Sequence, residues 1–275
     1  MPKVSVLVPL YNTDENHLKE MIESVLNQTF SDFELLLLND SPENNLVRQI
    51  AGSYCDSRIR YIENPQNLGI SASRNRLIEM AQGQYLAVFD HDDICLPTRL
   101  ELQVAYMDQH PEIGVCGGLA IEIPKNSICN YPESNEKIKQ GLLGGCCILH
   151  PASMVRKSVL IEHNIRYEAA YSPAEDYMLW VRLMAVTMFH NIQEPLIKYR
   201  NHLGNTSHRQ KDRMKDKDAM IKCIVLRDYP YLFIDNVKKA WIYLFGYIPL
   251  IKVKRQAEKK SYLLFGVIPI FSIKQ

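Results

Sequence analysis

Short apolar runs alternate with amphipathic stretches along the first 120 residues. Four segments rich in apolar residues predict strands: 4–8, 33–38, 59–62 and 86–89. The first of them is a continuous run without the alternation of a half-exposed strand, as expected for a parallel strand that is buried on both faces. Between them, apolar residues recur at helical spacing over 18–26 and 72–80, and Asn12 or Thr13 is a candidate N-cap for the first of these helices. This alternation predicts an α/β fold with a doubly wound, mostly parallel sheet flanked by helices.

The pattern is less regular after Pro97. It predicts a helix at 99–110, a strand at 114–121 and a helix at 174–186. The Gly- and Pro-containing stretch 124–145 has no clear period, so we expect it to be irregular or a flexible lid.

The composition is that of a globular protein, with 275 residues, 47% hydrophobic and 23% charged, which excludes disorder and collagen-like repeats. No apolar run reaches the roughly 18 to 20 uncharged residues of a membrane-spanning helix, and the N-terminus does not resemble a signal peptide. We therefore expect a cytoplasmic protein. The seven cysteines contain no C-x-x-C pair, so their spacing predicts neither a disulfide framework nor a zinc site.

The net charge of +1 hides an asymmetry between the two ends of the chain. Residues 209–275 hold 15 Lys and Arg against 6 Asp and Glu, whereas residues 1–208 hold 17 against 25. An acidic body with a basic tail suggests different partners for the two parts, with anionic lipid or nucleic acid as candidates for the tail. Solvated, lysine-rich helices explain the basic charge of residues 209–275 equally well.

The basic tail contains a repeat, because the segment 244–254 recurs as 264–274 with a shared Leu-Phe-Gly-x-Ile-Pro motif. Each copy is too short to span a bilayer but suits a membrane interface with anionic headgroups. The alternative is that both copies pack on the body as strands or short helices. We expect 209–275 to be a basic, helical extension that holds the protein peripherally at the inner face of the cytoplasmic membrane, and we expect no nucleic-acid partner.

Polar residues follow three of the predicted strands where these strands end. They are Pro9-Leu10-Tyr11-Asn12, Asn39-Asp40-Ser41 and Asp90-His91-Asp92-Asp93. Ligands of doubly wound sheets bind beyond the carboxyl ends of the strands. Three carboxylates within four residues favour a hard cation such as Mg²⁺ or Mn²⁺, although an isolated Asp-x-Asp is more often only an Asx-rich turn.

Five segments in this order carry a family resemblance: residues 4–12, 28–34, Asn67-Leu68-Gly69 with Arg74-Asn75, 90–93 and 175–176. Together they resemble the inverting family-2 glycosyltransferases of the GT-A fold, over about residues 3–207. The resemblance implies a GT-A domain at 1–208, with a nucleotide-binding half at about 1–114 and an acceptor half at about 115–208. It also implies a divalent cation, Mn²⁺ or Mg²⁺.

The reaction that the resemblance implies is transfer of a hexose or N-acetylhexosamine from a nucleotide-diphospho-sugar, with a UDP-sugar as the expected donor. Transfer would invert the anomeric carbon. The tail resembles those of bacterial enzymes that build lipooligosaccharide or capsule, so the expected acceptor is a hydroxyl of a saccharide or glycolipid in surface polysaccharide synthesis.

On the donor side, the resemblance implies that Tyr11 lies against the base, next to Pro9, and that Asp40 hydrogen-bonds the base or ribose. Arg74 would face the nucleotide. Asn39 replaces the first acid of the family's Asp-Asp-Gly-Ser stretch and the following Gly is missing, which leaves the shape of this loop open.

The Asp-x-Asp segment and a later histidine would surround the metal and the diphosphate. Asp92 is expected to coordinate the metal, Asp90 to contact the ribose or metal-bound water, and His91 to lie at the donor. Asp93 would support these residues. His202 would approach the diphosphate or the metal, although a histidine in such a loop is more often a simple surface residue.

On the acceptor side, Asp176 resembles the family's catalytic base, with Glu175 as the weaker candidate. Taken alone, this pair is equally an acidic start to a helix, which the helix dipole favours. His150 and Trp180 are candidates to line the acceptor pocket, and helix packing also explains Trp180.

Two other classes of function remain alternatives. A sugar-nucleotide nucleotidyltransferase also places carboxylates and a metal at strand ends, but it would show a Gly-rich basic loop after the first strand, where this chain has Pro9-Leu10-Tyr11. A non-catalytic nucleotide-sugar or lipid-binding module would have no need of all three acidic elements. A Rossmann oxidoreductase is excluded because no G-x-G-x-x-G follows a strand.

Overall fold

The structure is a computed structural model that describes residues 1–202, 204–229, 239–244, 248–256, 259–264 and 268–274. The chain divides into two compact units, 1–223 and 224–275, and each is described by itself. The division falls inside the last helix of the first unit, C-terminal to the boundary that the charge asymmetry suggests.

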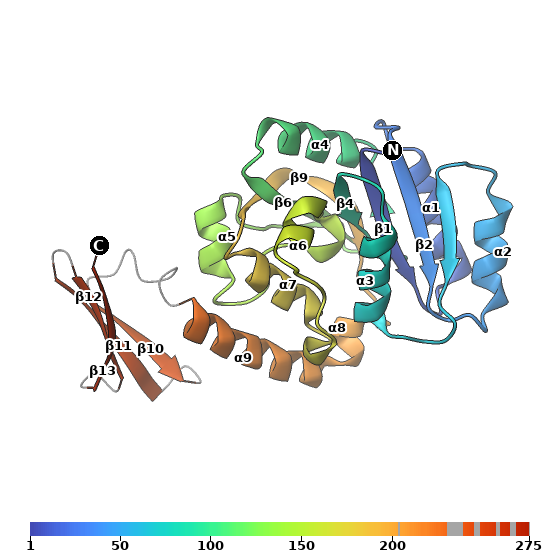
Figure 1. The fold of residues 1–275 in the computed structure, drawn as a ribbon. Coiled ribbons are helices and arrows are strands. Elements are labelled where there is room, and N and C mark those ends of the chain that lie inside the picture. Colours follow the sequence, from blue (N-terminus) through green and yellow to red (C-terminus); the bar gives the residue numbers. More distant parts are fainter. Residues whose placement is uncertain (203, 230–238, 245–247, 257–258, 265–267, 275) are drawn as a thin grey trace. The chain divides into compact units, whose positions relative to one another are not determined.

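Four parallel strands form one half of the central sheet, in the order β3 (Ile59–Glu63), β2 (Phe33–Asn39), β1 (Val4–Leu10) and β4 (Tyr85–Val88) (Figure 1). Every residue of β1, β2 and β4 is buried, as their mainly apolar sequences predict. The in-register parallel pairing brings the carboxyl ends of these strands to one edge of the sheet.

The other half of the sheet mixes strand directions. The short strand β8 (Met154–Arg156) runs antiparallel to both β4 and β6 (Ile113–Ile123), and β6 pairs in parallel with β9 (Met188–Arg200). The two-residue strand β5 (Ile94–Cys95) pairs with β9 at the far end of the order. The first unit is therefore an α/β fold with a mostly parallel, doubly wound sheet.

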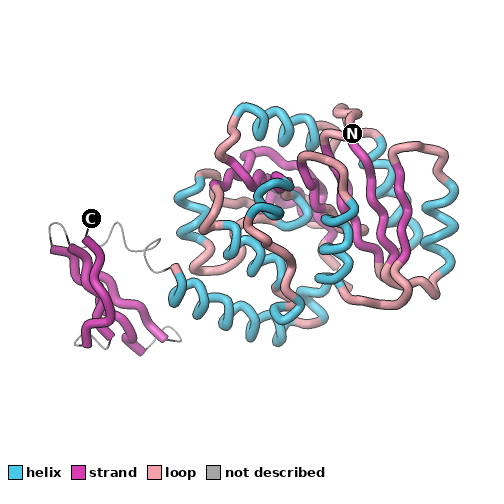
Figure 2. The backbone as a smooth tube through the Cα atoms, in the orientation of Figure 1, coloured by secondary structure: helices cyan, strands magenta, loops and turns pink. Residues whose placement is uncertain are grey.

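Helices flank this sheet (Figure 2). In chain order they are α1 (Glu15–Leu26), α2 (Asn45–Ser53), α3 (Ile70–Met80), α4 (Arg99–Gln109), α5 (Asn135–Gly141), α6 (Lys157–Glu162), α7 (Glu175–Leu183), α8 (Thr206–Arg209) and α9 (Lys211–Asp228), with 3₁₀ turns at His150–Ala152 and Ala169–Tyr171. Among the described residues, no helix has the length and apolar character needed to cross a membrane.

The N-cap of α1 is Asp14, and the sequence-based choice of Asn12 or Thr13 was wrong. The Asp14 carboxylate accepts from the backbone N–H groups of Asn16 and His17, at 2.9 and 3.1 Å. Asn12 instead adopts a positive φ of 45° in the turn after β1, where its N–H donates to the Ser41 hydroxyl.

The stretch 124–145 is more regular than its sequence predicts. The short strand β7 (Ser127–Cys129) forms a hairpin with β6, and Ser134 caps α5 through the N–H of Lys137. These elements are only three and seven residues long, and pairing with β6 and β9 rather than a sequence period stabilises them.

The extension was expected to be helical, but among its described residues the part after α9 is β-strand. The second unit is a four-stranded antiparallel sheet of β10 (Lys239–Leu244), β11 (Ile248–Gln256), β12 (Lys259–Leu264) and β13 (Ile268–Lys274). Each copy of the sequence repeat forms one hairpin, and the registers match at an offset of twenty residues: Lys239 pairs with Lys254, and Lys259 with Lys274. Residues 245–247 and 265–267, which contain the Phe-Gly of the motif, lie outside the described residues.

Candidate active site

The edge of the sheet where β1, β2 and β4 end carries the expected donor residues. Pro9 lies within buried β1, and Tyr11, just after this strand, is 50% exposed. A large aromatic side chain this exposed beside buried carboxylates leaves its ring face open to a flat ligand.

Asp40 is buried at the end of β2 and organises the neighbouring loop. Its Oδ1 accepts from Asn64 Nδ2 at 2.6 Å and from the Leu68 N–H at 2.8 Å, and its Oδ2 accepts from the Gly69 N–H at 2.9 Å. Gly69 has a φ of 83°, a conformation that favours glycine, and α3 begins directly after it. The carboxylate therefore fixes the loop that leads to Arg74, while Oδ2 has spare acceptor capacity.

Asn39 takes over the task of shaping the loop after β2. Its Oδ1 accepts from both the N–H and the hydroxyl of Ser41 at 3.0 Å, and its Nδ2 donates to the Tyr61 hydroxyl at 3.1 Å. The amide supplies an Asx turn that needs no glycine, which answers the question that the sequence left open.

Arg74 on α3 joins residues that are far apart in the sequence. Its Nη1 donates to Glu175 Oε1 at 2.7 Å and its Nη2 to Asp90 Oδ1 at 3.4 Å. The guanidinium is buried and lies over the Tyr167 ring, 5.4 Å from the centroid. The residue that was expected to face the nucleotide thus bridges the Asp-x-Asp segment and the start of α7.

The electrostatics of Asp90 reflect this bridge. Burial raises the pKa of Asp90, the nearby charge of Asp92 adds to the rise, and Arg74 opposes it. Asp93 is buried, and burial together with its two acidic neighbours raises its pKa well above the ordinary value. Its Oδ1 accepts from the Arg200 N–H at 2.8 Å, whereas Oδ2 is buried without a partner among the described residues.

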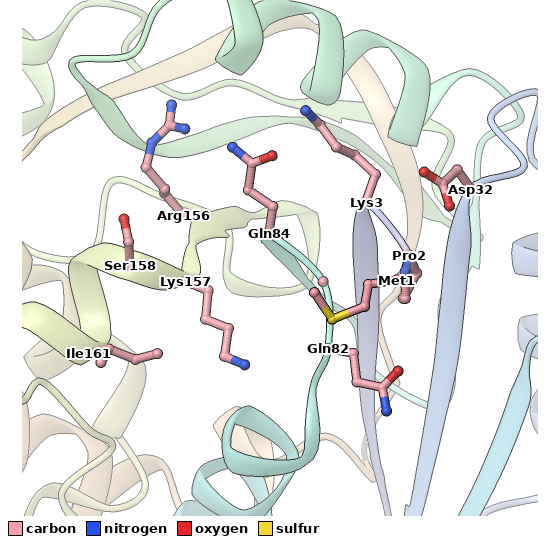
Figure 3. A pocket seen from close by; sticks show the side chains of 11 residues that line it. Met1, Pro2, Lys3, Asp32, Gln82, Gln84, Arg156, Lys157, Ser158 and Ile161 are labelled. Atoms are coloured by element: carbon pink, nitrogen blue, oxygen red, sulfur yellow. The ribbon is translucent and has the colours of Figure 1, made fainter.

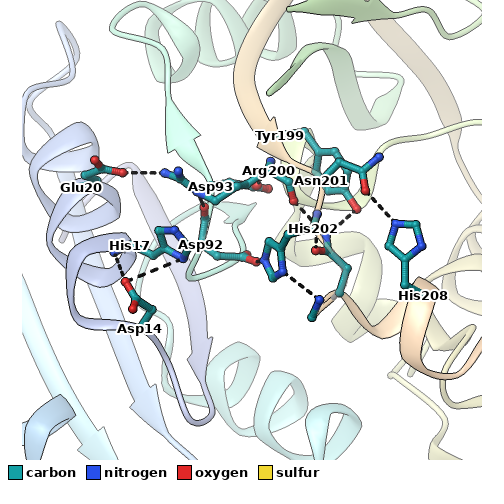
Figure 4. A network of polar contacts seen from close by, with 12 residues as sticks. Asp14, His17, Glu20, Asp92, Asp93, Tyr199, Arg200, Asn201, His202 and His208 are labelled. Carbon is teal, nitrogen blue, oxygen red and sulfur yellow. Dashed lines mark hydrogen bonds and ion pairs between the residues drawn. The ribbon is translucent and has the colours of Figure 1, made fainter. Parts of the chain in front are cut away.

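A network of polar contacts links Asp92 to the end of β9 (Figure 4). His202 Nε2 lies 2.9 Å from Asp92 Oδ2, and Arg200 donates from Nε to the Asp92 carbonyl at 2.6 Å. Arg200 also pairs with Glu20 of α1 at 2.6 Å. His17 adds its ring at 6.1 Å from that of His202. His202 therefore lies next to Asp92, and its approach to the diphosphate or the metal stays a prediction.

This arrangement fits a divalent cation. The Asp92 carboxylate is the type of ligand that Mg²⁺ and Mn²⁺ prefer, and His202 Nε2, 2.9 Å from Asp92 Oδ2, is the second side chain that would hold the ion. The buried Asp93 Oδ2 of the same segment has no partner among the described residues and is a further oxygen that a ligand could satisfy. Among the described residues, no three His, Cys, Asp or Glu side chains converge on one point, so the remaining ligands would be substrate phosphates and water, as is common for Mg²⁺.

Asp176 in the first turn of α7 has the environment of a general base. Burial raises its pKa to about 6, the charge of Glu175 adds to the rise and Arg74 opposes it. Its side chain is partly exposed, whereas Glu175 is buried and held by Arg74. Asp176 is thus the member of the pair that is open to a substrate, and its pKa suits proton transfer near neutral pH.

His150 and Trp180 lie in the interior rather than on an open pocket wall. Trp180 is fully buried and packs at 5.9 Å from the His150 ring, whose Nε2 shares a 2.8 Å hydrogen bond with the Tyr167 hydroxyl. Burial keeps the pKa of His150 well below its ordinary value. Both side chains therefore support Tyr167 and Arg74 from behind. His91 is partly exposed, and its Nδ1 is buried without a partner among the described residues.

A hollow of about 560 Å³ opens at the opposite, amino end of β1 and β4 (Figure 3). Its three cations are already engaged: Lys3 pairs with Asp108, Arg156 donates to backbone carbonyls including Met107 O, and Lys157 donates to Ala81 O. This end of the sheet carries none of the residues that the sequence singled out for chemistry.

Several residues of the site were missed at the sequence level. Arg200 and Glu20 shape the Asp92 turn, and Tyr167, held by a backbone contact to Asn75, lies beneath Arg74. The signal for Arg200 was its place two residues before His202 in a polar segment after a long strand.

Comparison with known proteins shows the family. The model of glycosyl transferase family 2 matches residues 5–163, and the chain belongs to this family. An uncharacterized glycosyltransferase of Methanocaldococcus jannaschii is 37% identical over 207 residues, which cover 72% of this chain and 71% of that protein. The amylovoran biosynthesis glycosyltransferase AmsE of Erwinia amylovora is 31% identical over 187 residues, with 66% of this chain and 70% of that protein covered.

Solved structures share the fold. TarS residues 1–349 of S. aureus in complex with UDP-GlcNAc superposes with a TM-score of 0.68 at 18% identity, covering 82% of this chain and 66% of that chain. The mannosyltransferase PcManGT of Pyrobaculum calidifontis, in complex with GDP-Man and Mn²⁺, gives 0.63 at 15% identity and covers 82% and 65%. The chain spans slightly less than two thirds of each solved chain. The first unit thus has the GT-A type of fold predicted from the sequence.

Proposed function

We propose that the protein is an inverting, metal-dependent hexosyltransferase that uses a nucleotide-diphospho-sugar, with a UDP-sugar as the favoured donor. The observation that carries this proposal is that the buried Arg74 binds Asp90 of the Asp-x-Asp segment on one side and Glu175, the neighbour of Asp176, on the other. A donor site and a base belonging to different halves of the chain are thereby held next to each other. TarS and PcManGT, which share the fold, are nucleotide-sugar complexes.

In the proposed reaction, Asp176 accepts the proton of an acceptor hydroxyl as the hydroxyl oxygen attacks the anomeric carbon. The new C–O bond forms opposite the leaving group, the bond between the anomeric carbon and the phosphate oxygen breaks, and UDP departs with the electron pair. Attack from the opposite face inverts the anomeric configuration. A carboxylate with a pKa of about 6 is largely ionised at neutral pH and is basic enough to assist this step.

The donor-side residues divide the remaining tasks. Tyr11 offers its exposed ring to the base, and the spare capacity of Asp40 Oδ2 suits the base or ribose. Asp92 and His202 hold the cation, with Asp90 and His91 beside them and Asp93 supporting the turn. When bound, Mn²⁺ or Mg²⁺ offsets the charge that grows on the departing diphosphate.

The acceptor proposed is a hydroxyl of a saccharide or glycolipid in bacterial surface polysaccharide synthesis. The similarity to AmsE, named for amylovoran biosynthesis, supports a polysaccharide context. We also propose that the basic second unit, with its two equivalent hairpins, holds the enzyme at an anionic membrane surface on the cytoplasmic side.

A donor-hydrolysis screen tests the proposal. The full-length protein is incubated with UDP-glucose, UDP-galactose, their N-acetyl derivatives and GDP-mannose, with and without Mn²⁺, and release of the nucleotide is measured. We expect release from one UDP-sugar in the presence of Mn²⁺. If no donor releases its nucleotide, the proposal is wrong. If only GDP-mannose does, the donor is a GDP-sugar and not a UDP-sugar.

A further inference from the structure

The segment between β7 and the 3₁₀ turn His150–Ala152 is held against the residue after Asp176, although its sequence pattern predicts no ordered structure. It contains Tyr131, helix α5 and the pair Cys146-Cys147. Tyr131 is partly exposed and Cys146 is exposed. The question is what holds these two side chains at the site and what they contact there.

One fully buried side chain ties both ends of this segment to the sheet. Asn191 of β9 donates from Nδ2 to Pro132 O at 2.7 Å and to Cys147 O at 3.1 Å, and its own N–H donates to Glu133 O at 3.0 Å. A single amide thereby fixes the residues that follow Tyr131 and Cys146. The two ends of the segment cannot move apart without breaking these hydrogen bonds.

The neighbouring strand is adapted to this amide. Gly117 of β6 is the register partner of Asn191, and a Cβ at Gly117 would lie 2.1 Å from Asn191 Oδ1. Glycine is therefore required opposite the amide, because any side chain would displace it. This close approach fixes the amide's position as well as its hydrogen bonds.

A second contact fixes the same segment relative to α7. The Tyr177 hydroxyl donates to the Leu142 carbonyl, and Tyr177 directly follows Asp176. Because Asn191 holds Pro132 and Cys147 and Tyr177 holds Leu142, Tyr131 and Cys146 belong to a segment that is fixed to the first turn of α7. Cys146 is exposed as a residue, but its Sγ is partly buried and donates to the Ile148 carbonyl at 3.2 Å. Burial first, and the Asp176 carboxylate in addition, raise the pKa of the Tyr131 phenol and the pKa of the Cys146 thiol.

We propose that Tyr131 and Cys146 form the wall of the acceptor subsite that faces Asp176, and that Asn191 positions this wall. The inference rests on the proposed function and names the ligand class of the same site: a pyranoside that lays its apolar C–H face on the Tyr131 ring. Its attacking hydroxyl points to Asp176. Tyr131 is a binding residue, whereas Asn191 acts only through the segment that it holds.

Substitutions of Tyr131 test the wall in the full-length protein. Transfer is followed to methyl glycosides of galactose, glucose and N-acetylglucosamine, with the donor found by hydrolysis. Tyr131→Ala should raise the acceptor KM at least tenfold while the affinity for UDP, measured by calorimetry, stays within twofold. Tyr131→Phe keeps the ring, so its acceptor KM should stay close to that of wild type. An equal rise of the acceptor KM in both variants, or an unchanged acceptor KM in Tyr131→Ala, overturns the proposal.

Asn191→Asp tests the positioning role because it keeps the shape and removes both N–H donors. The expected result is an acceptor KM raised at least tenfold, with UDP affinity and the donor KM within twofold of wild type. Asn164→Asp, on an exposed turn, is the matched control. If the affinities for UDP, donor and acceptor all weaken together, Asn191→Asp has lost structure in general, and this result contradicts the assignment.

Thiol blocking tests the wall without relying on the folding of a core variant. In a protein with the other two exposed cysteines, Cys55 and Cys223, changed to Ser, methyl methanethiosulfonate should block transfer to the glycoside and leave UDP affinity intact. Dithiothreitol should restore transfer, and Cys146→Ser should be insensitive to the reagent. Full transfer after labelling contradicts the proposal. A protein that hydrolyses the donor but uses no glycoside contradicts the acceptor class, whereas a protein without hydrolysis contradicts the proposed function itself.

Discussion

Arg74 and Glu175 are 101 residues apart in the sequence and form a buried hydrogen-bonded ion pair of 2.7 Å. The pair connects α3, which follows the nucleotide-side loop, to the first turn of α7. Since Arg74 also reaches Asp90, one guanidinium sets the distance between the proposed metal site and the proposed base.

The first prediction concerns the stability of this ion pair. Arg74→Met leaves the Glu175 carboxylate buried without its cation and should lower the free energy of unfolding by about 3–5 kcal/mol, measured by urea denaturation. Arg166→Met is the matched control, because Arg166 pairs with Glu79 at 2.6 Å on the surface and should cost less than about 1 kcal/mol. Equal effects of the two substitutions would mean that the buried pair adds nothing beyond a surface contact.

The double variant separates stability from activity at the same position. Arg74→Met with Glu175→Leu removes both charges and should regain most of the lost stability, because a buried ion pair can be replaced by packed apolar groups. Transfer should remain low, since Asp90 and Asp176 lose their shared cationic neighbour. Recovered transfer in the double variant would show that Arg74 serves only the fold.

Metal dependence is the second prediction. Asp92→Asn should lose most of the turnover while the melting temperature stays near that of wild type, and EDTA should abolish wild-type activity until Mn²⁺ is restored. His202→Ala should raise the Mn²⁺ concentration needed for half-maximal activity. His208→Ala is the control, since His208 contacts Asn201 and lies away from Asp92. Full activity in EDTA would exclude the metal role.

The pH dependence of transfer is the third prediction. Because burial raises the pKa of Asp176 to about 6, the carboxylate becomes ionised as the pH rises through about 6, and the rate should rise with it. Asp176→Asn should bind UDP with near-normal affinity by calorimetry yet transfer at least about a hundredfold more slowly, the range for a positioned base. Loss of UDP binding in this variant would indicate that Asp176 belongs to the donor site and is not the base.

The same shift predicts a stability effect of opposite sign to the activity effect. A folded-state pKa above the ordinary value means that ionisation of Asp176 weakens the fold, so this residue's contribution to stability is lost as the pH rises from about 4 to about 6. Asp176→Asn should therefore melt at a higher temperature than wild type at pH 8. The difference should vanish near pH 4. A lower melting temperature at pH 8 would contradict the raised pKa.

The final prediction concerns the second unit and membranes. Five cations between β11 and β12 (Lys252, Lys254, Arg255, Lys259 and Lys260) each contribute on the order of 1 kcal/mol near anionic lipid. Co-sedimentation of the full-length protein with vesicles containing acidic lipid should weaken steeply as salt rises through about 0.15 M. A chain ending at residue 229 should stay in the supernatant and still hydrolyse the donor. A full-length protein that stays in the supernatant at low salt would exclude the membrane role.

The sequence predicted those parts of the fold that are encoded locally. The strands β1 and β2 have apolar runs and the helices α1 and α3 have apolar residues at helical spacing, and both signals are local to the segment. Helix α2 was missed because only Val47, Ile50 and Ala51 of its nine residues are buried. The strand β8 is three residues long and exists only through its pairing with β4 and β6.

The side-chain network of the site lies beyond sequence reasoning because its contacts are long-range. Nothing local to Arg200 indicates that it pairs with Glu20, 180 residues away, or that its N–H reaches Asp93. Similarly, His150 and Trp180 carry polar atoms that look available in the sequence, and only the packing around Tyr167 shows that they face inward. The resemblance of motifs supplied Asp92 and His202 as neighbours, which spacing alone could not do.

The matching registers of the two C-terminal hairpins have an evolutionary consequence. Since Lys239–Lys254 and Lys259–Lys274 pair in the same way at an offset of twenty residues, a duplication of twenty codons adds two strands and leaves every existing pairing intact. The first strand of an added copy could pair with the last strand of the existing sheet in the way that β12 pairs with β11. Adding or removing one copy of twenty residues would therefore change this sheet by two whole strands.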